Sequence, residues 1–154
     1  MSRLTKVAID TSVIIEYIDK KGEFNEQAET IISALLTGKL EVVIPHPILA
    51  ETYYVATKIY YKLKVEDPHA VASKLIEWMY RLPMTIIPAE DINLAIEAGK
   101  TKLNYGLALT DCYVLATSKI NNCKAVFKKP EREMQKNMRQ LEQEYQLLFL
   151  KDYK

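Results

Sequence analysis

The chain has 154 residues, 49% hydrophobic and 27% charged, which predicts a single domain over residues 1–154 and argues against disorder. Its formal net charge is +1, so binding to nucleic acid would need a local basic patch rather than an overall field. Its two cysteines have no metal-site spacing and indicate reduced thiols. Without a signal sequence or an apolar run long enough to span a bilayer, we expect a cytoplasmic protein with no membrane contact.

The first predicted element is a short apolar strand at residues 7–9, whose lack of polar alternation is typical of a strand buried on both faces of a parallel sheet. Asp10 follows this strand, and Thr11 and Ser12 are expected to cap a helix over residues 13–18. Ligands of open α/β sheets bind beyond the carboxyl ends of the strands, so Asp10 is a candidate site residue. The alternative is that Asp10 only caps the turn.

The rest of the chain alternates between helical and strand patterns. Apolar residues at helical spacing predict further helices at residues 24–36, 48–63, 67–80, 90–103, 111–120 and 131–144. Short apolar runs between them predict strands at residues 40–44, 84–87, 124–127 and 145–150. This alternation predicts an α/β fold whose central, mostly parallel sheet of four to five strands is covered by helices on both faces.

Two further acids lie near the starts of predicted helices. Glu51 is one turn inside its helix and shares an apolar stripe with Ile48 and Val55, so it either sits at the solvent edge or has a partner such as a metal cation. Thr110 is the expected N-cap of a later helix, which makes Asp111 its first residue. A favourable interaction with the helix dipole is the alternative explanation for that acid.

The acids together suggest a metal site. Asp10, Glu51 and Glu131 come just after predicted strands, and the fold would have to bring Asp111 to the same edge of the sheet. Clustered carboxylates repel one another unless a cation lies among them, and an oxygen-only ligand set suits Mg²⁺ or Mn²⁺. Such a site favours metal-assisted hydrolysis of a phosphodiester. The chain has no Gly-rich phosphate loop and no serine triad, which argues against an NTPase or a serine hydrolase.

Four segments carry a resemblance to a known family, and they lie at residues 7–14, 47–51, 109–117 and 125–134. In this order they resemble the PIN-domain nucleases, particularly the VapC-type ribonuclease toxins and their archaeal relatives, and the resemblance covers nearly the whole chain. It implies a PIN-like three-layer sandwich. It also implies cleavage of RNA that depends on Mg²⁺ or Mn²⁺ and leaves 5′-phosphate and 3′-hydroxyl ends. VapC-type toxins often form homodimers and are commonly inhibited by a small antitoxin protein.

The resemblance also assigns roles to individual residues. Asp10, Glu51 and Asp111 match the acidic metal-site positions and are the expected catalytic residues, and Glu131 matches the fourth acid. Ser12 matches a small polar residue that supports the first acid. Further expectations are that Thr110 supports the acids and that RNA phosphates are bound by three basic side chains, Lys128, Lys129 and Arg132.

One corner of the motif departs from the family pattern. The fourth acid is more often Asp, with Thr or Ser two residues before it, where this chain has Glu131 and Lys129. Glu131 could bind metal only through water, or Glu133 could replace it. The alternative function is therefore a PIN-fold RNA-binding or RNA-processing module with weak or no nuclease activity. A receiver-like signalling domain would need further acids near the first strand, where Arg3 and Lys6 stand instead.

Overall fold

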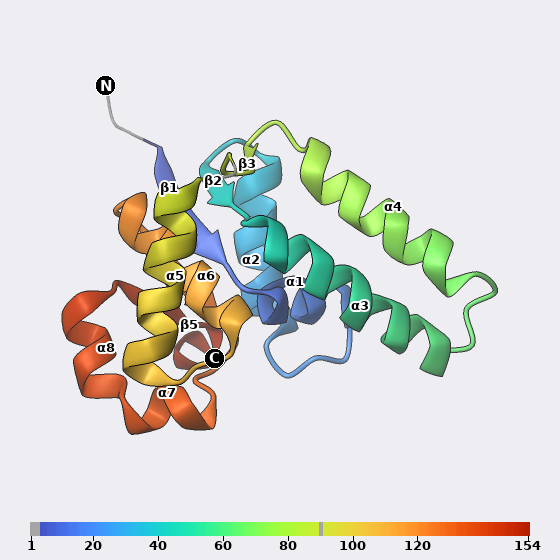
Figure 1. Ribbon diagram of the computed structural model, residues 1–154. Coiled ribbons are helices and arrows are strands. Elements are labelled where there is room, and N and C mark those ends of the chain that lie inside the picture. Colours follow the sequence, from blue (N-terminus) through green and yellow to red (C-terminus); the bar gives the residue numbers. More distant parts are fainter. Residues whose placement is uncertain (1–3, 90) are drawn as a thin grey trace.

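The computed structural model describes residues 4–89 and 91–154, which alternate strands and helices around one sheet (Figure 1). The strands are β1 (Thr5–Ile9), β2 (Leu40–Val43), β3 (Thr85–Ile86), β4 (Lys124–Phe127) and β5 (Leu147–Phe149). The helices are α1 (Thr11–Ile18), α2 (Asn25–Leu36), α3 (His46–Lys62), α4 (Pro68–Arg81), α5 (Ile92–Tyr105), α6 (Leu109–Ile120), α7 (Arg132–Lys136), α8 (Met138–Glu144) and the 3₁₀ turn η1 (Leu150–Tyr153).

Within the described residues the sheet has five strands in the order β3-β2-β1-β4-β5, and every pairing is parallel. The parallel α/β sheet expected from the sequence is therefore confirmed. The central strand β1 ends in Val7, Ala8 and Ile9, all buried, as the absence of polar alternation predicted. The chain places β2 and β3 on one side of β1 and then β4 and β5 on the other. The strand order thus reverses between β1 and β4.

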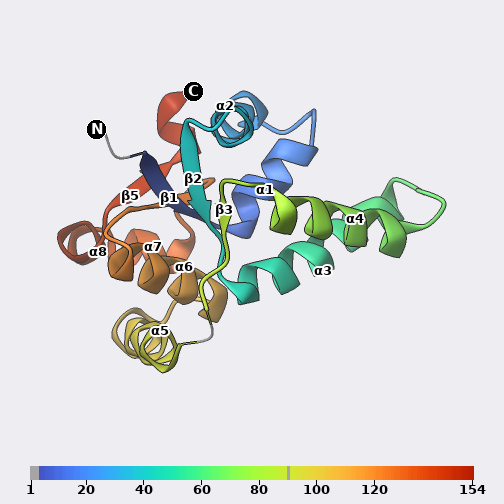
Figure 2. The same cartoon turned by 90° about the horizontal axis from the view of Figure 1, so that it is seen from above.

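Helices cover both faces of the sheet and complete three layers (Figure 2). One face carries α1 and α2, and the other carries α6 with α5 outside it (Figure 2). The apolar faces of these helices and of the strands form one continuous core that includes Ile14, Ile32 and Leu115. Helices α3 and α4 lie side by side and extend away from the sheet (Figures 1 and 2).

Several helix ends differ from the sequence prediction. The carboxylate of Asp10 caps α1 by accepting the Ser12 N–H, so Thr11 and Ser12 are inside the helix rather than at its cap. Helix α6 begins at Leu109 after the N-cap Ala108, so the prediction that Thr110 caps it is wrong. Helix α5 begins at Ile92 after Asp91, and Glu90, the predicted start, lies outside the described residues.

The single helix predicted over residues 131–144 is two helices, α7 and α8, that meet at Asn137. The Nδ2 of Asn137 donates to the carbonyls of Glu133 and Tyr105, at 2.9 and 3.3 Å. Short polar side chains compete in this way with the helical backbone pattern, which explains the break. Across residues 4–89 and 91–154 no helix is both long and apolar enough to cross a membrane, and Cys112 and Cys123 are free and buried.

Candidate metal centre

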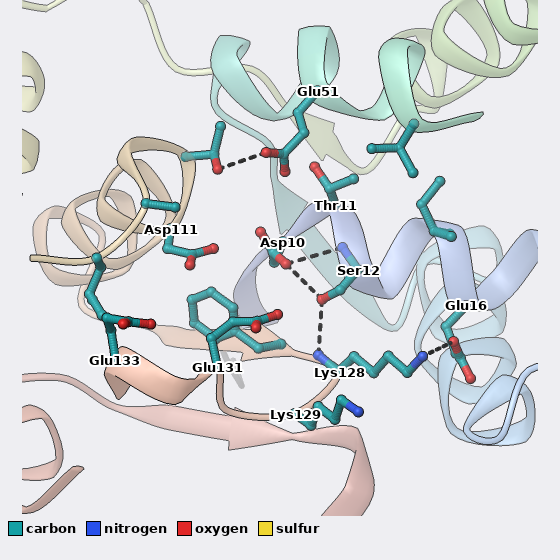
Figure 3. A pocket seen from close by; sticks show the side chains of 16 residues that line it. Asp10, Thr11, Ser12, Glu16, Glu51, Asp111, Lys128, Lys129, Glu131 and Glu133 are labelled. Atoms are coloured by element: carbon teal, nitrogen blue, oxygen red, sulfur yellow. Dashed lines mark hydrogen bonds and ion pairs between the residues drawn. The ribbon is translucent and has the colours of Figure 1, made fainter. Parts of the chain in front are cut away.

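A pocket of about 510 Å³ opens at the carboxyl edge of the sheet, beyond β1 and β4 (Figure 3). This is where the strand order reverses, which is the usual ligand position in open parallel sheets. Its walls come from α1, α3, the start of α6 and the segment after β4. The charged side chains that line it are Asp10, Glu16, Glu51, Asp111, Lys128, Lys129, Glu131 and Glu133.

The two carboxylate oxygens of Asp10 differ in their hydrogen bonds. Its Oδ2 accepts the Ser12 N–H at 3.1 Å and the Ser12 hydroxyl at 2.6 Å, while its backbone N–H extends the β1–β4 pairing by donating to Val126. Its Oδ1 is fully buried and has no hydrogen-bond partner. Asp10 therefore caps the helix, which was the alternative explanation for this acid. It also leaves one unpaired oxygen at the pocket. A buried unpaired carboxylate oxygen is costly, and a bound cation would offset that cost.

Glu51 reaches the pocket from the second turn of α3 and is joined to α6 by a hydrogen bond. The hydroxyl of Thr110 donates to Glu51 Oε2 at 2.8 Å (Figure 3). Thr110 therefore supports an acid of the pocket rather than its own helix end. The bond fixes one Glu51 oxygen and couples the helices that supply Glu51 and Asp111.

Asp111 lies in the first turn of α6 and is 9% exposed. Burial and the neighbouring carboxylates of Asp10, Glu51 and Glu131 raise the pKa of Asp111 to about 7. Burial also raises the pKa of Asp10, although its hydrogen bonds from Ser12 act in the opposite direction. Burial is the largest cause of the raised pKa in both acids, because it disfavours the charged carboxylate.

The segment after β4 brings two more acids to the pocket, Glu131 and Glu133, and both are exposed. The charge of Glu131 contributes to the raised pKa of Asp111. Glu131 is therefore electrostatically linked to the acid of α6, and Glu133 lines the same pocket.

The donor set fits a hard, oxygen-binding cation: carboxylates from the N-cap of α1, from α3 and from α6 face one space, and one of their oxygens is buried without a partner. Across the described residues, however, no three His, Cys, Asp or Glu side chains stand close enough to enclose a metal ion in this arrangement. Mg²⁺ commonly retains several waters and few direct protein ligands, and such an open set is compatible with that coordination.

An ion pair between the partly exposed Lys128 and the buried Glu16 lies at the other end of the pocket, and the sequence analysis did not predict it. Lys128 Nζ is 3.1 Å from Glu16 Oε2 (Figure 3). The other Glu16 oxygen accepts the Phe24 N–H at 2.6 Å. The Glu16 side chain is only 3% exposed. A methyl group on Gly22 would lie 2.6 Å from Glu16 Oε1, so glycine provides the space for this carboxylate. The available sequence signal was an acid inside the apolar helix pattern of residues 13–18.

The three residues predicted to bind phosphate lie in three different environments. The backbone N–H of Lys128 donates to Ser12 Oγ at 3.1 Å and its ammonium pairs with Glu16, so Lys128 joins β4 to α1. Lys129 lines the pocket and is exposed. Arg132 is exposed at the start of α7 and is not part of the pocket wall.

The fold and the pocket define the class: this is an α/β protein with a parallel sheet and an acidic pocket at the point where the strand order reverses. The pattern of the PIN domain matches residues 7–132, and the chain therefore belongs to the PIN-domain family. The family resemblance found in the sequence is thus confirmed. No curated protein sequence matches the chain significantly.

Several solved structures share the fold. VapBC2 from Rickettsia felis, bound to a DNA fragment from its promoter, matches with a TM-score of 0.62 at 13% identity over 94% of this chain and 98% of that one. VapBC-1 from nontypeable Haemophilus influenzae matches with a TM-score of 0.59 at 15% identity over 96% and 99%. The sarcin-ricin loop cleaving toxin VapC20 from Mycobacterium tuberculosis matches with a TM-score of 0.60 at 13% identity over 77% and 86%. At these identities the similarities establish a shared fold.

Proposed function

We propose that this protein is a divalent-metal-dependent endoribonuclease that hydrolyses RNA phosphodiester bonds. The observation that carries the proposal is the acidic pocket, with an unpaired buried Asp10 oxygen and an Asp111 pKa of about 7. PIN-domain proteins are typically metal-dependent nucleases, and one structural neighbour is the sarcin-ricin loop cleaving toxin VapC20.

In this function Asp10, Glu51, Asp111 and Glu131 would hold Mg²⁺ or Mn²⁺. The bound metal would supply Lewis acidity at the phosphate and lower the pKa of a water molecule. Ser12 keeps Asp10 Oδ2 in place by two hydrogen bonds, so that Oδ1 remains free for the ion.

On the substrate side of the pocket, Lys129 has an exposed ammonium for RNA phosphates. Thr110 orients Glu51 from α6. In this proposal Lys129 binds the substrate and Thr110 positions a metal ligand.

The test is RNA cleavage by the purified protein in Mn²⁺, with a chelator as the metal-free control. We expect Asp10→Asn and Asp111→Asn to lower the rate by at least about a hundredfold, because each removes a carboxylate from the metal site. Asp152→Asn, an exposed acid in η1, is the matched control and should retain activity. Wild-type cleavage by either pocket variant would refute the site assignment.

A second candidate function is an RNA-binding or RNA-processing module with weak or no nuclease activity. Two observations favour it: the motif departs from the family pattern at Lys129 and Glu131, and the acids do not enclose an ion in this arrangement. Calorimetric titration with Mn²⁺ separates the two. Absence of heat up to millimolar Mn²⁺, together with intact RNA binding, would select the module.

We further propose that the protein is the toxin of a VapBC-type pair, with a small antitoxin as partner, and that it forms homodimers in the cytoplasm. The support is that two structural neighbours are VapBC complexes. Expression of the chain alone should then arrest growth, whereas the Asp10→Asn variant should not. The mass in solution tests the dimer.

A further inference from the structure

Helix α3 continues outward from the pocket, and its outer half has an unusual surface. Glu51 and Val55 line the pocket from this helix. Between and beyond them along the helix, Tyr54 is 60% exposed and Tyr61 is 61% exposed, although tyrosine side chains are usually more buried. Figure 1 shows α3 running beside α4 away from the sheet, and the exposure of both tyrosines places them on the solvent side of α3.

The exposed tyrosines share one side of α3 with the pocket acid. Tyr54, Lys58 and Tyr61 follow Glu51 by three, seven and ten residues, which places all four on one side of the helix. At a rise of about 1.5 Å per residue the stripe from Glu51 to Tyr61 is about 15 Å long. We call Tyr54, Lys58 and Tyr61 the α3 stripe. It starts one turn after the pocket acid Glu51 and runs outward along α3.

The charge of this half of α3 is positive. Glu51 is the last acid in the sequence of the helix, and Lys58 and Lys62 follow it. The Lys58 ammonium lies 5.1 Å from the centre of the Tyr54 ring and 3.4 Å from its hydroxyl. In the stripe, the Lys58 cation thus lies between two aromatic residues, where it can pair with a phosphate.

The second ring of the stripe is held by its neighbours. Tyr61 contacts the His69 ring at a centroid distance of 5.9 Å and an angle of 89°. His69 in turn accepts from, or donates to, the Tyr53 hydroxyl at 2.9 Å. His69 therefore fixes Tyr61 from the α4 side while most of the Tyr61 side chain remains exposed.

We propose that the α3 stripe binds single-stranded RNA where the strand leaves the pocket. Bases stack on exposed aromatic rings with little sequence preference, and lysines between the rings neutralise the backbone phosphates. A purely apolar partner surface would not explain Lys58 between the rings. The proposal rests on the proposed function for its choice of RNA, and its test is binding rather than cleavage.

The test measures binding of a labelled single-stranded oligouridylate of about 12 nucleotides in chelator, where no metal-dependent cleavage occurs. Tyr54→Ala and Tyr61→Ala should each weaken binding about tenfold, because each removes a stacking ring. Tyr54→Phe keeps the ring and should bind like the wild type. Lys58→Met should reduce the slope of log affinity against log salt by about 0.7, the value for one phosphate contact on a single strand.

Matched controls come from other surfaces of the chain. Tyr153 is 65% exposed in η1, which is joined to α2 by a Gln27 hydrogen bond, so Tyr153→Ala should leave RNA affinity unchanged. Lys124 is exposed at the first residue of β4, at the sheet edge opposite the pocket, so Lys124→Met should leave the salt slope unchanged.

Wild-type RNA affinity in both Tyr54→Ala and Tyr61→Ala would overturn the proposal. A fall in molecular mass in these variants with unchanged RNA affinity would also overturn it, because the stripe would then be an interface between copies of the chain. If the wild type binds RNA through the stripe but does not cleave it in Mn²⁺, the proposed nuclease function fails and the stripe stands. If it cleaves RNA and the variants bind normally, the stripe fails and the function stands.

Discussion

At the scale of single residues, the buried carboxylates of the pocket include Glu16 and Asp10, and the protein compensates the charges of these two to different degrees. The Glu16 carboxylate is satisfied within the protein by Lys128 and the Phe24 N–H. One Asp10 oxygen is satisfied by Ser12, and the other has no partner. The Glu16 charge is therefore compensated within the protein, whereas in the proposed function the unpaired Asp10 oxygen would bind the metal ion.

Removing Lys128 should therefore destabilise the fold. Lys128→Met leaves the buried Glu16 charge without its cation, and we expect the free energy of unfolding to fall by about 2 kcal/mol, less than for a fully buried pair because the lysine is partly exposed. The double variant Glu16→Gln/Lys128→Met removes the charge and should recover part of the loss. Urea denaturation in chelator measures both, with the exposed Lys129→Met as control. An equal loss in the single and double variants would contradict the role of the pair.

The raised pKa of Asp111 predicts how the stability of the fold depends on pH. Its pKa of about 7 in the folded protein lies above the ordinary value of 3.8, so between these values the folded state holds more protons than the unfolded state. Stability in chelator should therefore fall as pH rises from about 4 to 7, by on the order of 4 kcal/mol for this group, and level off above pH 7.

The Asp111→Asn variant should lose most of this slope, because it has no carboxyl to titrate. Urea denaturation of both proteins at pH 5 and pH 7.5 tests the expectation. A slope that persists in the variant would place its source in another group.

The residue scale also shows which site members a sequence reveals. Asp10 was predictable because its strand and helix are adjacent in the chain, so local pattern alone puts it at a strand end. The contact of Glu16 with Lys128 joins residues far apart in sequence and exists only because β1 and β4 are neighbours. No local pattern contains that pairing.

At the scale of elements, two helices from distant parts of the chain are joined at the pocket by Thr110 and Glu51. Sequence periodicity placed most helices and strands correctly, since apolar spacing is a local signal. The prediction was wrong at the start of α6 and at Asn137. At both places a side chain forms a hydrogen bond to another segment, Thr110 to Glu51 and Asn137 to Tyr105. Capping patterns describe only what a side chain can do within its own helix.

The Thr110–Glu51 bond predicts a graded effect. Thr110→Val keeps the shape of the side chain but removes the donor, and we expect about 1 kcal/mol less stability and roughly a tenfold loss of cleavage activity. Thr110→Ser keeps the hydroxyl and should restore both. Denaturation and initial rates in Mn²⁺ measure them. If the serine variant behaves like the valine variant, the methyl packing of Thr110 matters and the hydrogen bond does not.

At the scale of the whole molecule, the reversal of strand order between β1 and β4 assembles the pocket. Asp10 and the Lys128–Glu131 segment follow neighbouring central strands, and α3 and α6 supply Glu51 and Asp111 from outside the sheet. Because these pieces come from most of the chain, an ion bound among the acids would link all of them. Metal binding should therefore stabilise the entire fold rather than one loop.

The stability of the whole protein thus reports metal binding without any assay of activity. Mn²⁺ at a hundred times its dissociation constant should add about 2.7 kcal/mol and raise the melting temperature by about 5–10 °C, and chelator should reverse the shift. Asp10→Asn should abolish most of the shift, because it removes the unpaired buried carboxylate oxygen at the pocket. The Asp152→Asn control should keep it. An equal Mn²⁺ shift in the Asp10→Asn variant would mean that the ion binds elsewhere and that the buried Asp10 oxygen is not one of its ligands.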